Sequence, residues 1–459
     1  MDSPVNMHSL DEKSRQLREK ILDYARTRMS YEAVPLDAPA TAEYLQTHAS
    51  GSVSELGLGG DAALALFSDV LAPACLSTDH PGYVSFIPTA PTQAATAFDL
   101  VVSASSIYGG SWMEGAGAVF AENEVLAWLA EEVGLPSHAG GVFVQGGTLG
   151  NLSALVAARH SANVARQTAG LTRPERWKFV CSEEAHSSLK AAAAVMDVDI
   201  VKAKVNEAGR LTGEAVAEAL VNAGDGVFAV VATAGTTNFG IVDRLREVGE
   251  VAKQAGLWFH VDGAYGLAGI LAPETKPLFD GSELADSFIV DPHKWLFAPF
   301  DACALVYRNP ELARAAHAQH GEYLDTLTDS GDWNPSDYAY NLTRRVRGLP
   351  LWFSLATHGI AAYRDAIASN IRVTHEIAEE IRKRPRLRLV REPELSVVVF
   401  EHVDWELSDY EAWSARLIAS GLGLVVPSSH RGRPNTRFAI INPKTTTALL
   451  TEILDSMEN

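Results

Sequence analysis

Between residues 140 and 306 the chain alternates short, continuously apolar runs with longer segments of helical character. The runs have the length of strands, and in chain order they are "GVFVQGG" (141–147), "RWKFVCS" (176–182), "GVFAVVATAG" (226–235), "LWFHVDGAYG" (257–266), "SFIVDPHKW" (287–295) and "ACALVYR" (302–308). Strands that are apolar along their whole length are buried on both faces, and helical connections make neighbouring strands parallel. This alternation predicts an α/β fold with a mostly parallel sheet covered by helices on both faces.

The flanking segments predict smaller units on both sides of this sheet. Residues 9–30 carry apolar positions at helical spacing among many charges, and residues 61–74 are again helical in character. A long helix is expected through 350–383, followed by strands within 387–402 and 436–443. We therefore expect three parts, which are an N-terminal helical segment (1–75), a large α/β domain (76–350) and a smaller C-terminal α/β domain (351–459).

The charge balance limits the class of partner that the chain can bind. A formal net charge of −19 argues against nucleic acid and against an anionic membrane surface. The N-terminal residues contain no apolar signal core, and no apolar run has the length of a membrane span, so a cytoplasmic location is expected. Cys75, Cys181 and Cys303 are widely separated, which predicts neither a metal site nor a disulfide framework.

Three distinctive polar residues, Asp262, His186 and Lys294, follow apolar runs. Because the carboxyl ends of parallel strands lie along one edge of a sheet, these side chains are expected to meet there. A buried ammonium group is costly unless it is paired, neutralised or used covalently. Pyridoxal phosphate (PLP) needs a lysine for an imine with its aldehyde and a carboxylate for its pyridine nitrogen. In isolation each residue has an alternative role as a turn cap, a helix start or a surface lysine, but their joint occurrence favours the cofactor site.

The segment "QGGTLGNLSALVAAR" (145–159) is a candidate phosphate site. Its two glycines let the backbone approach an anion, and Thr148 offers both a hydroxyl and an amide. The helix that follows presents free N–H groups and the positive end of its dipole. A plain capped helix start also accounts for "GGT", so this segment gains its meaning from the other three residues.

Four motifs give the chain a resemblance to a known family, and they are "HKW" (293–295), "HVDGAYG" (260–266), "TAGTTNFGIVD" (233–243) and "GGTLGNL" (146–152). They resemble those of the group II PLP-dependent decarboxylases, which include aromatic-L-amino-acid, histidine and glutamate decarboxylases. The resemblance spans about residues 75–355, and "TRFAIINP" near the C-terminus fits as well. It implies the fold-type I, aspartate aminotransferase-like architecture of PLP enzymes.

The resemblance also implies a role for each matching residue. Lys294 would hold PLP as an internal aldimine, and Asp262 would pair with the pyridinium nitrogen to stabilise a quinonoid carbanion. His186 would stack on one face of the ring. The remaining cofactor positions would be Ala264 on the other face, Thr237 near the ring, and Gly147, Thr148 and His293 at the phosphate.

A homodimer with active sites at the interface is a further implication, with the N-terminal segment wrapped around the partner. In the aromatic-amino-acid members, a mobile loop of the neighbouring subunit supplies a tyrosine that returns a proton to the α-carbon. The corresponding stretch here is 328–345, where the expected position falls near Pro335 and Tyr338 and Tyr340 lie a few residues away. Both tyrosines are candidate donors, with structural packing as the alternative, and members without the tyrosine form aldehydes instead.

Two segments resemble the substrate-lining parts of the family, and they suggest Phe86, Ile87, Thr89, Tyr108 and Trp112 as lining residues. Gly110 stands where aromatic-specific members carry a bulky aromatic, so a roomier pocket is an alternative. Asp291 replaces an asparagine often found near the phosphate, and we assign it no phosphate contact. Arg437 could reach a substrate carboxylate or form a structural ion pair.

The favoured function is decarboxylation of an L-amino acid to its amine, with an aromatic substrate slightly preferred. The alternatives are an aldehyde synthase that combines decarboxylation with oxidative deamination, or another carbon–carbon lyase of the same family. An aminotransferase shares the fold but typically lacks a histidine directly before the lysine. A catalytically silent scaffold is disfavoured because Lys294, Asp262 and His186 are all present.

Overall fold

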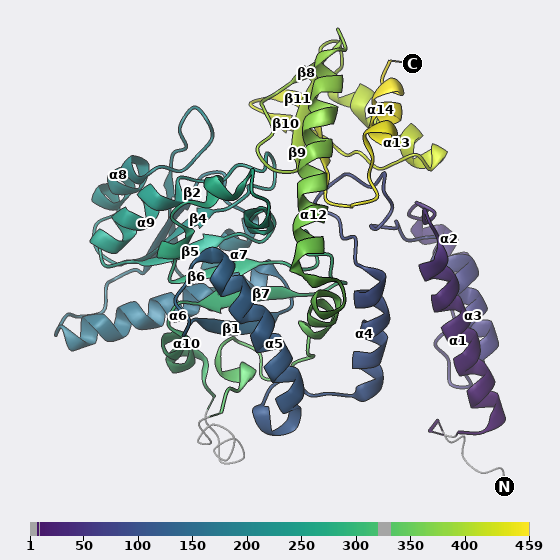
Figure 1. Cartoon of the computed structure of the whole chain (residues 1–459), viewed down its shortest axis with the longest axis horizontal. Coiled ribbons are helices and arrows are strands. Elements are labelled where there is room, and N and C mark those ends of the chain that lie inside the picture. Colours follow the sequence, from purple (N-terminus) through teal and green to yellow (C-terminus); the bar gives the residue numbers. More distant parts are fainter. Residues whose placement is uncertain (1–6, 9, 320–331, 459) are drawn as a thin grey trace.

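The computed structural model describes residues 7–8, 10–319 and 332–458. Its N-terminal elements are α1 (Glu12–Ser30), α2 (Ala42–Ala49) and α3 (Gly60–Leu66), and α3 continues into a π-helical turn (Phe67–Leu71). These helices lie beside the rest of the molecule, as Figure 1 shows. None of the described residues in α1, α2 or α3 is buried. The N-terminal helices are therefore poorly covered within a single chain.

The large unit is built on a sheet whose strands are β1 (Gly140–Val144), β2 (Lys178–Ser182), β3 (Asp199–Ala203), β4 (Val227–Thr233), β5 (Trp258–Asp262), β6 (Ser287–Val290) and β7 (Cys303–Tyr307). Their spatial order is β1-β7-β6-β5-β4-β2-β3. The pairs β3–β2, β2–β4, β4–β5 and β5–β6 are parallel, and β7 runs antiparallel to both β6 and β1. The mostly parallel sheet predicted from the apolar runs is confirmed, with β7 as its antiparallel member.

The helices of the large unit are α4 (Gln93–Ser105), α5 (Trp112–Val133), α6 (Gly147–Thr168), α7 (Ser187–Met196), α8 (Gly213–Ala223), α9 (Leu245–Gln254) and α10 (Pro310–His317). Successive side chains of a strand point to opposite faces, so each face of the sheet has its own core. Phe143 belongs to the core that includes side chains of α5, α8 and α9, whereas its neighbours Val142 and Val144 belong to the core that includes side chains of α6, α7 and α10. Both faces are covered by helices, which explains why the strands are apolar throughout.

The helix α12 (Leu349–Arg382) connects the two units, as Figure 1 shows, and it contains a non-helical residue at Gly359. The smaller unit contains β8 (Leu387–Leu389), β9 (Val397–His402), α13 (Leu407–Ser420), β10 (Pro427–His430), β11 (Arg433–Ala439) and α14 (Thr447–Asp455). Its antiparallel sheet has the order β10-β11-β9-β8. Side chains from the C-terminal half of α12 and from α13 and α14 form a separate core with this sheet.

The sequence-based expectations miss two strands at sheet edges. The edge strand β3 is partly exposed, and β10 is a short polar strand that pairs with β11 across Arg431 and Gly432. Both turn residues have positive φ, at 50° and 78°, as a tight hairpin turn requires. No helix among the described residues is long and apolar enough to cross a membrane, and the cytoplasmic location stays a prediction.

Candidate active site

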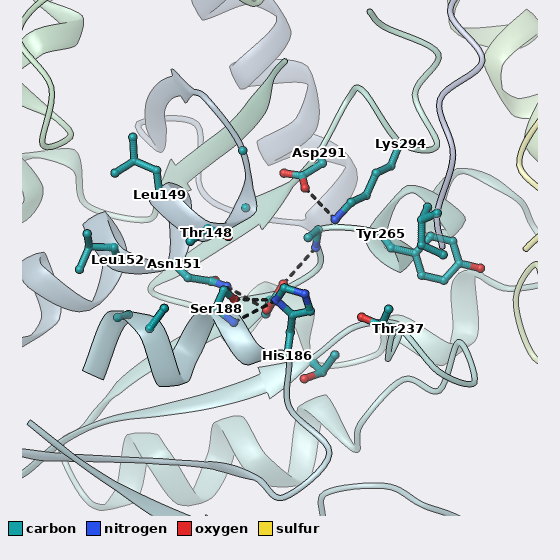
Figure 2. Close-up of a pocket in the computed structure, with 18 of the residues that line it drawn as sticks. Thr148, Leu149, Asn151, Leu152, His186, Ser188, Thr237, Tyr265, Asp291 and Lys294 are labelled. Carbon is teal, nitrogen blue, oxygen red and sulfur yellow. Dashed lines mark hydrogen bonds and ion pairs between the residues drawn. The ribbon is translucent and has the colours of Figure 1, made fainter. Parts of the chain in front are cut away.

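The candidate active site lies where β2, β4, β5 and β6 end and α6 begins. Figure 2 shows residues that line it. A cavity of about 650 Å³ opens at this edge of the sheet. Most of the predicted site residues line it, and these are Phe86, Ile87, Gly147, Thr148, His186, Thr237, Asp262, Ala264, His293 and Lys294. The topology therefore brings together side chains as far apart in the sequence as Phe86 and Lys294, because the parallel strands end at one edge.

Lys294 follows β6 and points its amine into the cavity. Its Nζ lies 2.8 Å from Oδ2 of Asp291, whose side chain is only 1% exposed. Burial by itself lowers the pKa of Lys294, but attraction to Asp291, the hydrogen bond with it and a contribution from Asp262 outweigh burial and raise that pKa. Asp291 thus balances the charge of the buried ammonium group. In Figure 2 a dashed line joins these two side chains.

Asp262 is the last residue of β5 and is almost completely buried. Its Oδ2 accepts a hydrogen bond of 2.9 Å from Nδ2 of Asn151, and its Oδ1 accepts one of 3.2 Å from the backbone N–H of Ala264. Both carboxylate oxygens therefore have a donor that fixes the plane of the group. The carboxylate can offer its remaining lone pairs to a cationic N–H in the cavity.

His186 stands at the N-cap of α7, as its alternative reading as a helix-start histidine anticipates. Its Nδ1 accepts a bond of 3.2 Å from the N–H of Ser188 and lies 2.9 Å from the hydroxyl of the same serine. These contacts leave the proton of a neutral imidazole on Nε2. The ring nevertheless lines the cavity, so capping and a functional role are compatible.

The residues predicted to bind a phosphate lie in the first turn of α6. The N-cap residue Gly146 has no side chain, so the early N–H groups of the helix point toward the cavity without a side-chain cap. A Cβ at Gly147 would lie 3.1 Å from Oδ2 of Asp291 and 3.2 Å from the Cβ of Ala264. A side chain at Gly147 would therefore press against both neighbours.

Three of the predicted substrate residues do not line this cavity. Thr89 is buried and donates its hydroxyl to the carbonyl of Ala298 at 3.1 Å, while Tyr108 donates to the carbonyl of Leu342 at 3.0 Å. Trp112 begins α5. A Cβ at Gly110 would lie 2.3 Å from the hydroxyl oxygen of Tyr108, so the Tyr108 side chain already occupies that space. Within one chain these three residues therefore lie outside the cavity wall.

The two candidate tyrosines also lie outside the cavity wall. Tyr338 is 3% exposed and stacks on Trp333 with ring centroids 4.1 Å apart, and burial raises the pKa of its phenol. Tyr340 is 69% exposed. Tyr338 is therefore packed in the interior of the chain, whereas the ring of Tyr340 is accessible. Residues 328–331 of the stretch that contains them lie outside the described residues.

Arg437 holds two segments of the cavity wall. Its guanidinium donates to the backbone carbonyls of Thr237 and, at 3.4 Å, of Phe86. The structural ion pair considered for it is absent among the described residues, which give it these carbonyl acceptors instead. Sequence reasoning also missed several lining residues, among them Asn151, Ser188 and Tyr265. Asn151 lies within the quoted "GGTLGNL" motif, one helical turn after Thr148, and its polar character on a buried helix face is the signal that could have found it.

Comparison with known proteins gives the family. The model of the pyridoxal-dependent decarboxylase conserved domain matches residues 59–403. The chain is 27% identical over 465 residues to an aromatic-L-amino-acid decarboxylase of Bacillus atrophaeus, with 98% of this chain and 95% of that protein covered. It is 30% identical over 418 residues to an L-2,4-diaminobutyrate decarboxylase of Rhizobium meliloti (strain 1021), with 88% and 82% covered.

The fold has matches among solved structures as well. The structure of Oryza sativa TDC with PLP and tryptamine superposes with a TM-score of 0.88 at 24% identity, and the match covers 100% of this chain and 99% of that one. This likeness supports the fold-type I architecture expected from the motifs. Since the family model covers most of the chain, including every strand of the large sheet, the protein belongs to the pyridoxal-dependent decarboxylases and is a PLP-dependent amino-acid decarboxylase.

Proposed function

We propose that the chain converts an L-amino acid into its amine and carbon dioxide, with a preference for an aromatic side chain. The observation that carries this proposal is the convergence of Lys294 and Asp262 on one cavity from the neighbouring strands β5 and β6. An amine and a carboxylate so placed can engage the aldehyde and the ring nitrogen of one PLP molecule. The uncapped start of α6 and the crowded position of Gly147 fit a phosphate group.

Each residue of the site has a separate role in the proposed reaction. PLP, when bound, supplies an electron-accepting ring for the carbanion that loss of carbon dioxide leaves. Lys294 would hold the cofactor covalently, and its Nζ would be returned beside Asp291 when the substrate amine takes its place. Asp262 would keep a proton on the pyridine nitrogen. His186 and Ala264 would restrict the ring from its two faces, and Gly147, Thr148 and His293 would bind the phosphate, with Thr237 near the ring.

The cavity wall favours an apolar substrate side chain. Phe86 is 57% exposed and Val195 is 73% exposed, and both line the cavity together with Ile87. Asp301 also lines it, but its carboxylate lies 2.9 Å from Nε of Arg347, which compensates its charge. A cationic substrate side chain would have to compete with that arginine. We therefore place an aromatic amino acid ahead of a diamino acid as the substrate.

A panel of the twenty standard amino acids plus 2,4-diaminobutyrate tests the reaction. We expect carbon dioxide with an aromatic amino acid and PLP, without hydrogen peroxide or ammonia. Carbon dioxide, peroxide and ammonia should therefore be measured separately for each substrate. Peroxide and ammonia appearing in step with carbon dioxide would replace the proposal with an aldehyde synthase, and a higher kcat/KM for 2,4-diaminobutyrate would overturn the substrate preference.

We further propose that the protein acts as a homodimer with active sites at the interface, in which residues 1–75 wrap the partner, 76–350 form the PLP-binding domain and 351–459 form the small domain. Four apolar side chains on α4 and α5 are about half exposed or more, and they are Leu100, Val101, Met113 and Phe120. The N-terminal helices add a further poorly covered surface. A second copy of the chain would cover both surfaces, and would bring Tyr340 within reach of another subunit's site as the proton donor.

Phe120→Glu should separate the dimer into monomers, because burying a carboxylate in the interface would require its desolvation, which is unfavourable. Analytical ultracentrifugation of the wild-type and variant proteins measures this change. Val221→Glu is the matched control, since Val221 is 83% exposed on α8, which lies at the upper left of Figure 1, away from α4 and from the N-terminal helices. A wild-type monomer, or a Phe120→Glu variant that sediments as the wild-type dimer does, would refute this interface.

A further inference from the structure

A chain of buried hydrogen bonds ends on Asp262. Nε1 of Trp258 lies 2.8 Å from the hydroxyl of Ser287, and that hydroxyl lies 2.8 Å from Nδ1 of His260. Nε2 of His260 lies 2.9 Å from Oδ1 of Asn151, whose Nδ2 lies 2.9 Å from Asp262. Ser287 and His260 are completely buried, and Asn151 is 1% exposed. These polar groups occupy space between β5, β6 and α6 that apolar side chains could fill.

The donor and acceptor groups of these residues fix the direction in which each hydrogen bond is donated. The indole N–H of Trp258 can only donate, so the hydroxyl of Ser287 accepts from it and donates its own proton to Nδ1 of His260. Burial lowers the pKa of His260 to about 4, so the imidazole is neutral and carries its one proton on Nε2. That proton is donated to Oδ1 of Asn151. The opposite orientation of the amide would place its oxygen against the Asp262 carboxylate, where two acceptors would face each other.

The amide group of Asn151 makes a second contact toward the cavity. Its Nδ2 also lies 2.9 Å from the hydroxyl of Ser188, which in turn lies 2.9 Å from Nδ1 of His186. The serine hydroxyl accepts from Asn151 and donates to His186. Figure 2 shows Asn151, Ser188 and His186 close together beside Thr148. One amide thus contacts the carboxylate directly and the imidazole through one hydroxyl.

We propose that Asn151 is a positioning residue that orients Asp262 and His186 for the cofactor, and that His260 and Ser287 fix the orientation of its amide. This inference rests on the proposed function, since it takes Asp262 and His186 as the groups that contact the PLP ring. Asn151 lies one turn after Thr148 on α6, so the same helix that offers an anion site also sets the hydrogen bonds of the acid. Ring binding and phosphate binding are therefore connected through one rigid element.

Two substitutions test the role of this amide in the full-length protein. Asn151→Leu keeps the branched shape of the side chain but removes both donated hydrogen bonds. Asn151→Asp keeps the shape but places a second carboxylate 2.9 Å from Asp262, where it can restore the hydrogen bond only after it takes up a proton. We expect both variants to raise the dissociation constant of PLP, titrated by absorbance, at least about tenfold. The ratio of the PLP affinity of Asn151→Asp to that of the wild type should be higher at pH 6 than at pH 8.5.

The matched control is Asn442→Leu. Asn442 is also buried and makes two side-chain hydrogen bonds of 2.9 Å, with the carbonyl of Asp79 and the N–H of Lys444, but it does not line the cavity. It should lose thermal stability without a change in PLP affinity. Asn151 variants whose PLP affinity stays within about twofold of the wild type at both pH values would overturn the inference. A wild-type protein that binds no PLP would overturn the proposed function itself. If Asn151→Leu does not fold, Ser287→Ala replaces it: this variant leaves Asn151 in place and should raise the dissociation constant of PLP by a smaller factor.

Discussion

Lys294→Ala is expected to eliminate the visible absorbance band of the PLP-loaded protein and to stop carbon dioxide formation. Among the described residues that line the cavity, Lys294 is the one lysine, so no neighbouring amine can take over its covalent bond. The loss of activity should exceed the about 10²–10⁴-fold that removal of a general acid–base group alone causes, because the attachment point of the cofactor is lost as well. Absorbance spectra after dialysis, and carbon dioxide release with the best substrate, measure the two effects.

Lys294→Arg separates the covalent role of the lysine from its electrostatic role. An arginine keeps a positive charge next to Asp291, which is 1% exposed and would otherwise be left without its 2.8 Å partner. It cannot form an imine, because its guanidinium does not lose its proton in proteins. The thermal stability of Lys294→Arg should therefore exceed that of Lys294→Ala, while both lack the band. Persistence of a covalent PLP band in either variant would show that another residue holds the cofactor.

The ends of parallel strands explain why three residues of the candidate site were predictable from the sequence. Parallel strands that are buried on both faces read as apolar runs, and the first polar residues after them have to lie at one edge of the sheet. Lys294, Asp262 and His186 were found in this way. The rule does not reach Asn151 and Ser188, which lie on helices, where a polar residue is ordinarily read as facing solvent.

The direction of β7 and the substrate-lining segments were beyond the same rule. An apolar run carries no information about strand direction. The one signal for β7 is its connection to β6, which contains no helix for the crossover that a parallel pair needs. Tyr108, Trp112 and Tyr340 were predicted from a family in which two subunits share each site. One chain can place them away from its own cavity without contradicting such a role, because their position relative to a second copy is not written in its local sequence pattern.

The second large effect is expected for Asp262→Asn, which should bind PLP covalently yet decarboxylate its substrate poorly. The asparagine is isosteric, and Lys294 remains available for the covalent bond. The amide lacks the negative charge that would hold a proton on the pyridine nitrogen, and it has one oxygen where the carboxylate accepts from both Asn151 and Ala264. Removing one partner of a buried, hydrogen-bonded charge pair costs about 2–5 kcal/mol.

This cost corresponds to a fall in kcat of about 30- to 5,000-fold, since about 1.4 kcal/mol is a factor of ten in rate. Asp243→Asn is the matched control: Asp243 is equally buried and accepts two backbone N–H bonds of 2.7 Å from Leu211 and Thr233, but it is not among the described residues of the cavity wall. Its substitution should cost stability and leave kcat nearly unchanged. If Asp262→Asn kept the wild-type kcat, the ring nitrogen would not need this carboxylate, and the role proposed for Asp262 would be wrong. A variant that lost the covalent band as well would instead place Asp262 in the binding of PLP, with its hydrogen bonds to Asn151 and Ala264 serving affinity rather than rate.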